Sequence, residues 1–237
     1  MRIESFRLVP FALIALAACA AAPGVVEGPA PAAGAPAQDA AVIAAELRRA
    51  TRPTTPRQAN FSWALDESGA RFNGRGVARF RAPERFRLDL FGPRGETYFA
   101  AALVDETPRV PASIAEQRFR LPSPALLWGA LGVVRPPATA RLLNAADAGG
   151  TTLVRYDLGD EGTLEYRARG GVLQSVRRLR GGGVQESIDL EHASNGALRG
   201  ARYREWIALR TLNLTLESTN DVASFSEDIW SPPGTAR

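Results

Sequence analysis

The chain has 237 residues with a formal net charge of +4, and its 29 basic residues are all arginine. That length can carry one large all-β domain, and nothing in the composition requires a second domain. The single histidine and the single cysteine are too few for a zinc site, so the composition argues against metal chemistry.

The N-terminal residues have the pattern of an export signal. Two arginines precede an apolar run from Leu8 to Ala18, which is about ten residues long and too short to span a bilayer as a helix. The run ends in Leu16-Ala17-Ala18-Cys19, which resembles the lipobox of bacterial lipoproteins. The resemblance implies cleavage before Cys19 and acylation of its sulfur and new amino group. The alternative is a plain secretory signal in which this residue, the only cysteine, is incidental.

Ala20 follows the cysteine, at the position where aspartate tends to retain such lipoproteins in the inner membrane. The resemblance therefore implies an outer-membrane lipoprotein, anchored by acyl chains such as palmitate, whose domain faces the periplasm. More than one acyl signal gives stable attachment to a membrane. Because an exported protein rarely meets nucleic acid, we expect the membrane as a partner and no nucleic acid.

The composition divides the chain into a signal peptide (1–18), a tether (19–38) and a single domain (39–237). The tether is mostly alanine, proline, glycine and valine without periodicity, which is typical of a flexible linker. A short helix is expected next, with Asp39 as its cap and Pro53 at its end. Its apolar face would consist of Val42, Ile43 and Leu47. The alternative is that this segment only lengthens the tether, because short helices are marginal in isolation.

From Phe61 onward the hydrophobic period changes to two, which indicates β-strands. In the stretch 85–90 the apolar residues Phe86, Leu88 and Leu90 share one face, and the opposite, charged face must be wet. The strands expected in the first half are 61–65, 72–81, 85–90 and 96–104.

The expected strand 96–104 is apolar on both faces. Phe99, Ala101 and Leu103 would point to one side, and Tyr98 would point to the other. Something must therefore cover both sides of this strand. The turn before it, Gly92-Pro93-Arg94-Gly95, combines a proline corner with a final glycine that can adopt positive φ.

The second half repeats the alternating pattern, with strands expected at 151–158, 163–169, 172–180, 184–190, 201–209 and 212–218. Ile188, Leu212 and Leu214 fall on apolar faces, and Glu186 falls on the apolar side of its strand as well. Strands separated by short turns indicate an antiparallel meander and not βαβ units. Roughly ten such strands would curl into a barrel or an open half β-barrel, giving a mainly β fold.

Between the two halves, Ser123-Pro124 marks the start of a helix, with serine at the cap and proline in the first turn. The apolar run 125–134 would form this helix, and Pro136-Pro137 would end it. No residue of the run is charged, whereas a solvent-facing helix would carry a polar stripe. We therefore expect this helix to be buried against the sheet, to plug a cavity or to contact a membrane.

This order of lipobox, linker, short helix, arginine-rich meander and apolar helix resembles the LolA/LolB-like lipoprotein carriers. The stretch 85–95, Arg-Phe-Arg-Leu-Asp-Leu-Phe-Gly-Pro-Arg-Gly, looks like the R-L-x-L-x-G-P-x-G turn of LolB-like outer-membrane lipoproteins. The resemblance implies a bent antiparallel sheet whose apolar concavity is closed by helices. It also implies that acyl chains or lipoproteins bind there during lipoprotein localisation, and that an exposed apolar loop meets the bilayer.

The favoured function is therefore non-enzymatic binding of acyl chains or lipoproteins in an apolar groove, without a cofactor. The candidate groove residues are Phe86, Leu88, Leu90, Phe99, Leu103, Ile188, Leu212 and Leu214. The candidate lid residues are Leu126, Leu127, Trp128 and Leu131. The alternative is an envelope scaffold or assembly partner with the same fold and a packed interior, in which these residues are ordinary core.

Little in the sequence favours catalysis, so an esterase or glycosidase is the least favoured class. His192, the only histidine, falls where a strand runs into a turn, and no Gly-x-Ser-x-Gly elbow accompanies it. Asp160 and Glu161 lie in a glycine-flanked turn, where they are most simply solvated charges. The run Gly181-Gly182-Gly183 lacks the lysine and the following helix of a phosphate loop.

Overall fold

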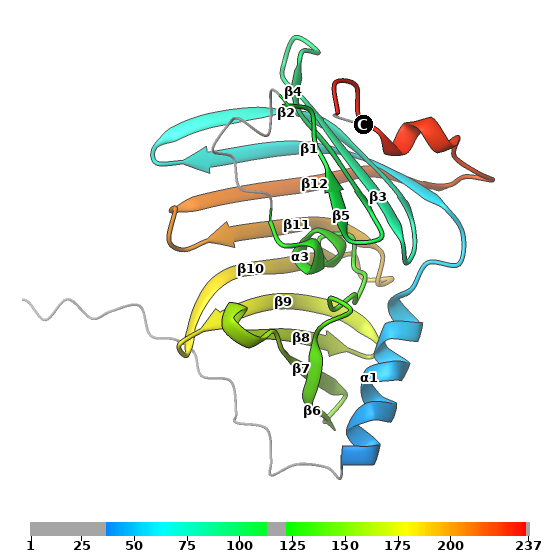
Figure 1. Cartoon of the computed structure of the whole chain (residues 1–237), viewed down its shortest axis with the longest axis vertical. Coiled ribbons are helices and arrows are strands. Elements are labelled where there is room, and N and C mark those ends of the chain that lie inside the picture. Colours follow the sequence, from blue (N-terminus) through cyan, green and yellow to red (C-terminus); the bar gives the residue numbers. More distant parts are fainter. Residues whose placement is uncertain (1–36, 113–121, 236–237) are drawn as a thin grey trace, which may run out of the picture. The chain divides into compact units, whose positions relative to one another are not determined.

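The computed structural model describes residues 37–112 and 122–235, which belong to one unit of the chain, Pro31–Arg237. In this unit twelve antiparallel strands form one sheet (Figure 1) in the order β5-β4-β3-β2-β1-β12-β11-β10-β9-β8-β7-β6. Strands that follow each other in the sequence are paired, except β5 and β6, which are the two edges. Because these edges do not pair, the curled sheet stays open. The mainly β, open half-barrel fold predicted from the sequence is confirmed.

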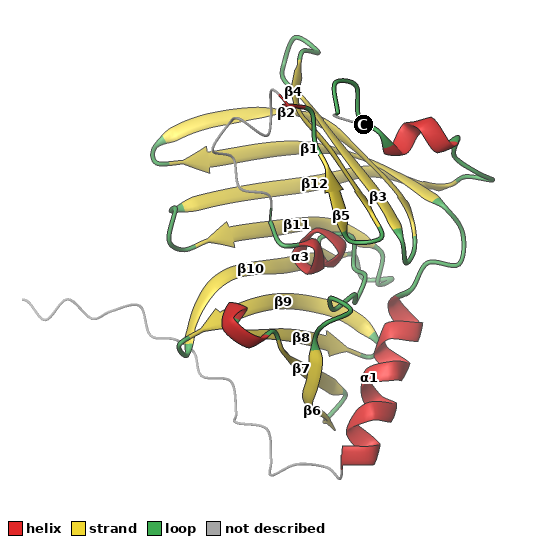
Figure 2. Cartoon of the chain, viewed as in Figure 1, coloured by secondary structure: helices red, strands yellow, loops and turns green. Residues whose placement is uncertain are grey.

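The bounds of the elements are as follows. The strands are β1 (Arg57–Glu67), β2 (Ala70–Arg81), β3 (Arg85–Phe91), β4 (Thr97–Val104), β5 (Thr107–Arg109), β6 (Arg141–Ala148), β7 (Thr151–Asp157), β8 (Thr163–Arg169), β9 (Val172–Arg180), β10 (Gly183–His192), β11 (Leu198–Glu205) and β12 (Arg210–Asp221). The helices are α1 (Ala37–Thr51) and α3 (Pro124–Gly129), with single 3-10 turns η1 (Gly159–Glu161) and η2 (Glu227–Trp230) (Figure 2).

Among the described residues no helix is long and apolar enough to cross a membrane. The predicted signal peptide, Cys19 and nearly all of the predicted tether lie outside the described residues.

The sequence pattern did not predict β5 or β6. β5 has only three residues, and the alternation of β6 is interrupted by a register shift between Leu142 and Asn144. The prediction that the strand through Ala201 continues to Leu209 is wrong. β11 ends at Glu205, and the four residues that follow form a turn.

The predicted N-terminal helix is present as α1, although it begins two residues before Asp39. Its buried face consists of Ala40, Ala44 and Leu47, and the helix packs against β6 and β7. The prediction that Val42 belongs to this face is wrong, because its side chain is 54% exposed. Val42 lies two residues from both buried alanines, so it points to nearly the opposite side of the helix.

The predicted mid-chain helix is present as α3, but it is shorter than expected. Gly132 adopts a φ of +78°, its backbone N–H donates to the carbonyl oxygen of Gly129 (2.8 Å), and that of Val133 donates to the carbonyl oxygen of Trp128 (3.1 Å). This pair of bonds is a Schellman motif, which ends a helix at a glycine. The prediction that Pro136-Pro137 ends the helix is therefore wrong.

Both faces of β4 are covered, as the sequence predicts. On the inner face, which carries α3, alternate residues from Phe99 to Leu103 belong to an apolar core. On the outer face, η2 contacts β3 and β4, and its Trp230 is 1% exposed. Arg87 of β3 donates to the carbonyl oxygen of Ile229 at 2.7 Å. The C-terminal segment thus covers the outer face of β3 and β4. The prediction that the charged face of the stretch 85–90 is wet is wrong, because Asp89 on that face is 4% exposed.

The inner face carries two apolar cores that meet at α3. The β1–β4 core includes Leu127 and Trp128 of the helix, whereas the core over β6–β11 includes Leu126. Leu212 and Leu214 of β12 pack against both cores. The helix therefore lies where the two halves of the meander join, at the centre of the sheet in Figure 1.

Candidate functional site

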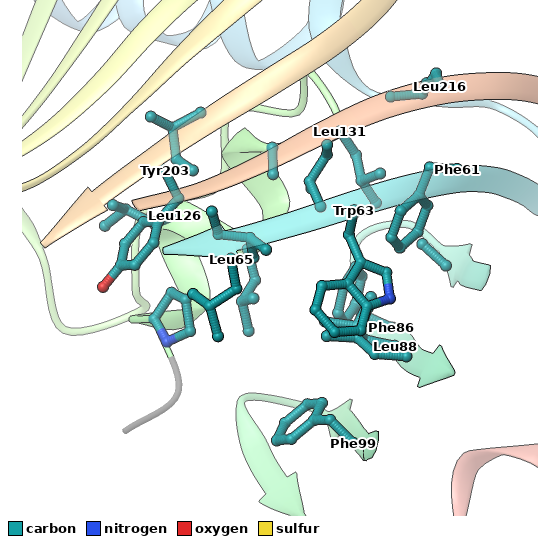
Figure 3. Close-up of a pocket in the computed structure, with 18 of the residues that line it drawn as sticks. Phe61, Trp63, Leu65, Phe86, Leu88, Phe99, Leu126, Leu131, Tyr203 and Leu216 are labelled. Atoms are coloured by element: carbon teal, nitrogen blue, oxygen red, sulfur yellow. The ribbon is translucent and has the colours of Figure 1, made fainter. Parts of the chain in front are cut away.

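A cavity lies between α3 and the inner face of β1, β3, β4 and β12 (Figure 3). In the described part of the chain its walls are formed by Phe61, Trp63, Leu65, Ala78, Phe86, Leu88, Leu90, Tyr98, Phe99, Pro122, Leu126, Leu127, Ala130, Leu131, Ile188, Tyr203, Arg210, Leu212, Leu214 and Leu216. The surface that these residues turn toward the cavity is apolar.

The cavity is narrow in this state. The space between its side chains, mouth included, is about 910 Å³, but the centres of water-sized molecules have room in only about 50 Å³. Sites for small molecules usually offer roughly 300–1,000 Å³. A ligand of that size therefore requires the lining side chains or α3 to move apart.

The floor of the cavity is an apolar ladder across β1 and β12. Its pairs are Phe61 with Leu216, Trp63 with Leu214, and Leu65 with Leu212. The three leucines of β12 are only partly buried, although they face the inside of the curl. The ring of Trp63 is fixed by its Nε1–H, which donates to the carbonyl oxygens of Arg75 (3.0 Å) and Phe91 (3.2 Å). The apolar ladder thus combines buried side chains of β1 with leucines of β12 that keep apolar surface open.

Tyr98 and Phe99 both line the cavity, although they are consecutive residues of β4. Leu90 pairs with Phe99 and Phe91 pairs with Thr97, which leaves Tyr98 as the extra residue of a β-bulge. Its ring centroid lies 5.0 Å from that of the tryptophan of β1. The prediction that Tyr98 and Phe99 point to opposite faces is wrong, because strict alternation ends at the bulge.

The roof of the cavity is α3 and the residues that follow it. Leu126, Leu127 and Leu131 turn toward the cavity. A Cβ atom at Gly129 would lie 2.7 Å from Cγ2 of Val176 in β9, so glycine is what allows the helix to approach the sheet this closely. The roof therefore rests directly on the sheet.

Trp128 of α3 does not line the cavity and is 1% exposed. Its ring packs against Phe80 and Phe86, with centroid distances of 6.3 Å and 5.6 Å. The guanidinium of Arg135 lies over the same ring, 5.2 Å from the centroid. Trp128 is the side chain through which the roof packs into the β1–β4 core.

Charged residues cross the inner face next to the cavity, where β1 and β11 end and β12 begins. Arg210 lines the cavity, and its Nε donates to Glu67 at 2.9 Å while its Nη1 donates to Glu205 at 3.2 Å. Its side chain is only 9% exposed, so the charge is neutralised inside the protein. This charged row forms a polar border to the apolar cavity.

Glu186 lies on the inner face, as its place in the alternating pattern predicts, and it is buried. Arg178 Nε donates to one carboxylate oxygen at 2.6 Å, and the hydroxyl of Tyr203 donates to the other at 2.8 Å. Burial, reinforced by the charge of Glu186, raises the pKa of Tyr203 well above its ordinary value, so the phenol stays a hydrogen-bond donor. The carboxylate is tolerated among apolar residues because both of its oxygens are satisfied.

The turn between β11 and β12 presents an exposed apolar surface beside Arg210 and its carboxylate partners. Trp206, Ile207 and Leu209 are 49%, 78% and 75% exposed, and they directly precede Arg210. We call Trp206, Ile207 and Leu209 the apolar tip. Exposed apolar side chains that cluster in this way commonly mark a surface for a membrane or a partner.

The structure brings together most of the residues that the sequence singled out. All twelve candidate groove and lid residues line the cavity except Leu103 and Trp128, which are buried in the adjoining core. Their role in binding lipid stays a prediction. Phe61, Trp63 and Leu65 were missed as site residues, although their alternation was visible in the sequence.

The remaining candidates lie elsewhere. His192 ends β10 and is partly buried, which lowers its pKa, and it does not line the cavity. Asp160 and Glu161 are exposed in η1. Cys19 lies outside the described residues.

The sequence matches no protein-family model and no curated protein. The fold is similar to that of a LolA superfamily protein from Nitrosomonas europaea, with a TM-score of 0.55 and 10% identity over 81% of this chain and 97% of the other. It is also similar to a putative outer membrane lipoprotein-sorting protein domain from Vibrio parahaemolyticus, with a TM-score of 0.52 and 9% identity over 82% of this chain and 97% of that one. The domain therefore has a LolA/LolB-like fold.

Proposed function

Because the domain has a LolA/LolB-like fold, we propose that the protein is an outer-membrane lipoprotein that binds acyl chains, free or attached to lipoproteins. The cavity beneath α3 is the site. The observation that carries this proposal is that the β12 leucines of the apolar ladder are only partly buried, which keeps apolar surface open inside the sheet. The similar structure from Vibrio parahaemolyticus is described as a putative outer membrane lipoprotein-sorting protein domain, which supports a role in lipoprotein localisation.

The driving force for binding is burial. Each methylene of an acyl chain that leaves water contributes about 0.8 kcal/mol. The cavity wall offers no polar surface among the described residues, so it suits the chain and not a polar headgroup. Since the free space is small, part of this energy is needed to displace α3 from the leucines below it.

The apolar tip is the part of the domain that contacts the bilayer in this proposal. It corresponds in character to the exposed apolar loop that the resemblance to LolB-like lipoproteins implies. Its position beside Arg210, at the border of the cavity, would let a chain pass between the membrane and the site. Acylation of Cys19 would keep the domain at the membrane surface between transfers.

The narrowness of the cavity favours a second candidate, a non-enzymatic envelope scaffold or assembly partner with a packed interior. In that case the apolar ladder belongs to the hydrophobic core and packs against α3 without leaving a binding site. The two functions differ in one measurable property, because only the carrier binds lipid saturably.

The test combines two measurements. Native mass spectrometry of the purified protein would reveal lipid that co-purifies with it, and titration with a fluorescent fatty acid would measure affinity. Leu214→Trp fills the cavity and should abolish binding with a cooperative melt retained, whereas Leu143→Trp, at a 48% exposed leucine of β6, should bind as the parent does. A protein that carries no lipid and ignores the fatty acid would leave only the scaffold.

Attachment through the cysteine is tested separately. Cys19→Ser removes the acyl acceptor, so metabolic labelling with palmitate should disappear. Labelling of the variant at the parent level would contradict the lipoprotein assignment while leaving the cavity proposal intact.

A further inference from the structure

A second cleft, of about 450 Å³, lies apart from the apolar cavity and shares no lining residue with it. Its walls are the last turns of α1, the turn between β2 and β3, the segment 133–140 and Tyr156 of β7. Four arginines line it, Arg48, Arg49 and Arg52 from the helix end and Arg135 from the segment after α3. We call this the arginine cleft.

The arginines of the helix end have no carboxylate partner in the part of the chain that the structure describes. Within the described residues no ion pair is formed by Arg48, Arg49 or Arg52, whereas arginines of the sheet such as Arg79 and Arg155 pair with buried carboxylates. Like charges three and four residues apart on a helix repel each other. The partial negative charge at the C-terminal end of α1 favours positive side chains there. It supplies no hydrogen-bond partner for any of the three guanidiniums.

The carboxylate of Glu106 contacts two residues of the cleft wall, Arg135 and Ala138. It lies 3.8 Å from Nη2 of Arg135 and accepts a hydrogen bond from the backbone of Ala138 at 3.1 Å. Asp105 and Glu84 act on Arg135 electrostatically from farther away. None of these three carboxylates is among the described residues that line the cleft, and the charged residues that do line it are all arginines.

Two buried polar groups of the cleft also lack partners. Tyr156 is 4% exposed, and its hydroxyl has no hydrogen-bond partner among the described residues. Nη1 of Arg135 is likewise buried without a partner in the described part of the chain. Burial raises the pKa of Tyr156, so its hydroxyl remains a donor. A buried donor without an acceptor is costly. Both atoms are closed to solvent in this state, so a ligand oxygen recovers that cost when the cleft wall opens to admit it.

The donors of the cleft are guanidiniums and a phenol, and it contains several of them. Guanidinium groups match the geometry of oxyanions, and a phosphate offers three or four acceptor oxygens and up to two charges to this set. A single carboxylate offers two oxygens and one charge, which leaves most of the donors unsatisfied. We propose that the arginine cleft binds the phosphate group of a lipid headgroup or of a small soluble phosphate ester.

The experiment uses the full chain purified in an uncharged detergent. The probes for calorimetric titration are inorganic phosphate, glycerol 3-phosphate, and dihexanoyl phosphatidic acid below its micelle concentration. We expect at least one probe to bind with a Kd of about 1 mM or tighter. The comparison is made in the Leu214→Trp variant, whose acyl cavity is filled: tighter binding of the phosphatidic acid than of glycerol 3-phosphate then assigns a lipid headgroup, and equal or weaker binding assigns a soluble ester. The absence of heat with every probe overturns the proposal.

Two variants locate the site. Arg48→Gln with Arg52→Gln should weaken binding about tenfold or more, whereas the matched control Arg180→Gln with Arg199→Gln should not, because these exposed arginines of β9 and β11 do not line the cleft. Tyr156→Phe removes only the unpartnered hydroxyl, so it should weaken binding several-fold without lowering the melting temperature. Equal weakening by the control pair, or parent-like binding by both cleft variants, overturns the proposal. Because the two cavities share no lining residue, fatty-acid binding should be the same in these variants as in the parent.

Discussion

Gly76 of β2 lies directly beneath the ring of Phe61, its partner in β1: a Cβ atom added to Gly76 would lie 2.3 Å from that ring. The glycine therefore leaves room for an aromatic side chain of the cavity floor. The same strand is small at Gly74 and Ala78, the other positions next to the floor. Small residues on β2 and large ones on β1 together determine where the cavity surface runs.

Gly76→Ala should destabilise the domain by about 1–3 kcal/mol, because the methyl group forces Phe61 to shift in a packed core. Urea unfolding followed by fluorescence measures the change. The control is Gly183→Ala in β10, where an added Cβ would have no neighbour closer than 3.8 Å and φ is not positive. Equal stability of the two variants would mean that the ring of Phe61 moves freely.

Gly95 closes the hairpin between β3 and β4 with a φ of +82°. Its backbone N–H donates to the carbonyl oxygen of Gly92 at 3.0 Å, and a Cβ atom added to Gly95 would meet nothing within 4 Å beyond its chain neighbours. Gly95→Val should therefore cost about 1–3 kcal/mol through backbone strain alone. Gly95→Asn should cost less, because asparagine tolerates this conformation. A valine variant that melts at the parent temperature would contradict the turn geometry.

Leu131 is partly exposed in the roof, whereas Leu127 is buried. Leu127→Ala should cost about 2–5 kcal/mol of stability, and Leu131→Ala should cost less. If α3 moves during binding, Leu131→Ala should alter fatty-acid affinity by more than it alters stability.

Trp128 emission should also shift on binding, because its ring moves with the helix. The comparison with Trp128→Phe isolates that signal from the other tryptophans, and an unchanged spectrum at saturation would argue for a fixed roof.

The apolar tip should govern contact with membranes. A form without residues 1–38 should associate with phospholipid vesicles, and Ile207→Glu with Leu209→Ser should reduce that association several-fold. Stability should not change, because these side chains are 78% and 75% exposed. Val42→Glu, on the exposed face of α1, is the matched control. Loss of vesicle association with that control would mean that charge, and not the tip, determines binding.

Glu227 links the C-terminal segment to β3 through Arg85. The hydrogen bond from Arg85 lowers the pKa of Glu227 below its ordinary value of 4.5. A carboxylate of this kind stabilises the fold above pH 4.5 and loses that effect as the pH falls through the lowered pKa. The melting temperature should therefore fall on acidification from about pH 5 to about pH 3, and Glu227→Gln should show a smaller fall. If the melting temperature of Glu227→Gln depends on pH as that of the parent does, the pair of Arg85 and Glu227 does not hold the C-terminal segment.

Local signals were sufficient to predict most of the sheet. The alternation of Phe86, Leu88 and Leu90 and the turn at Gly92–Gly95 predicted a hairpin that the structure contains. The uncharged run after Ser123 predicted a helix with three possible placements, and the structure shows burial against the sheet. These features depend on residues a few positions apart, so the chain itself carries them. The end of α3 was predictable in principle from Gly132, which ends the helix before the prolines do.

What the sequence by itself determined is therefore the antiparallel meander, its apolar inner face and the apolar helix. Only the tertiary structure decided which apolar residues line a cavity, because that depends on strands far apart in the chain. Phe61 meets Leu216 only because β1 pairs with β12. The partners of Glu186 and the bulge at Tyr98 were invisible for the same reason, since they arise from the register between strands. The arginine cleft brings Arg48 and Arg135 together from distant parts of the sequence, a proximity that no local pattern encodes.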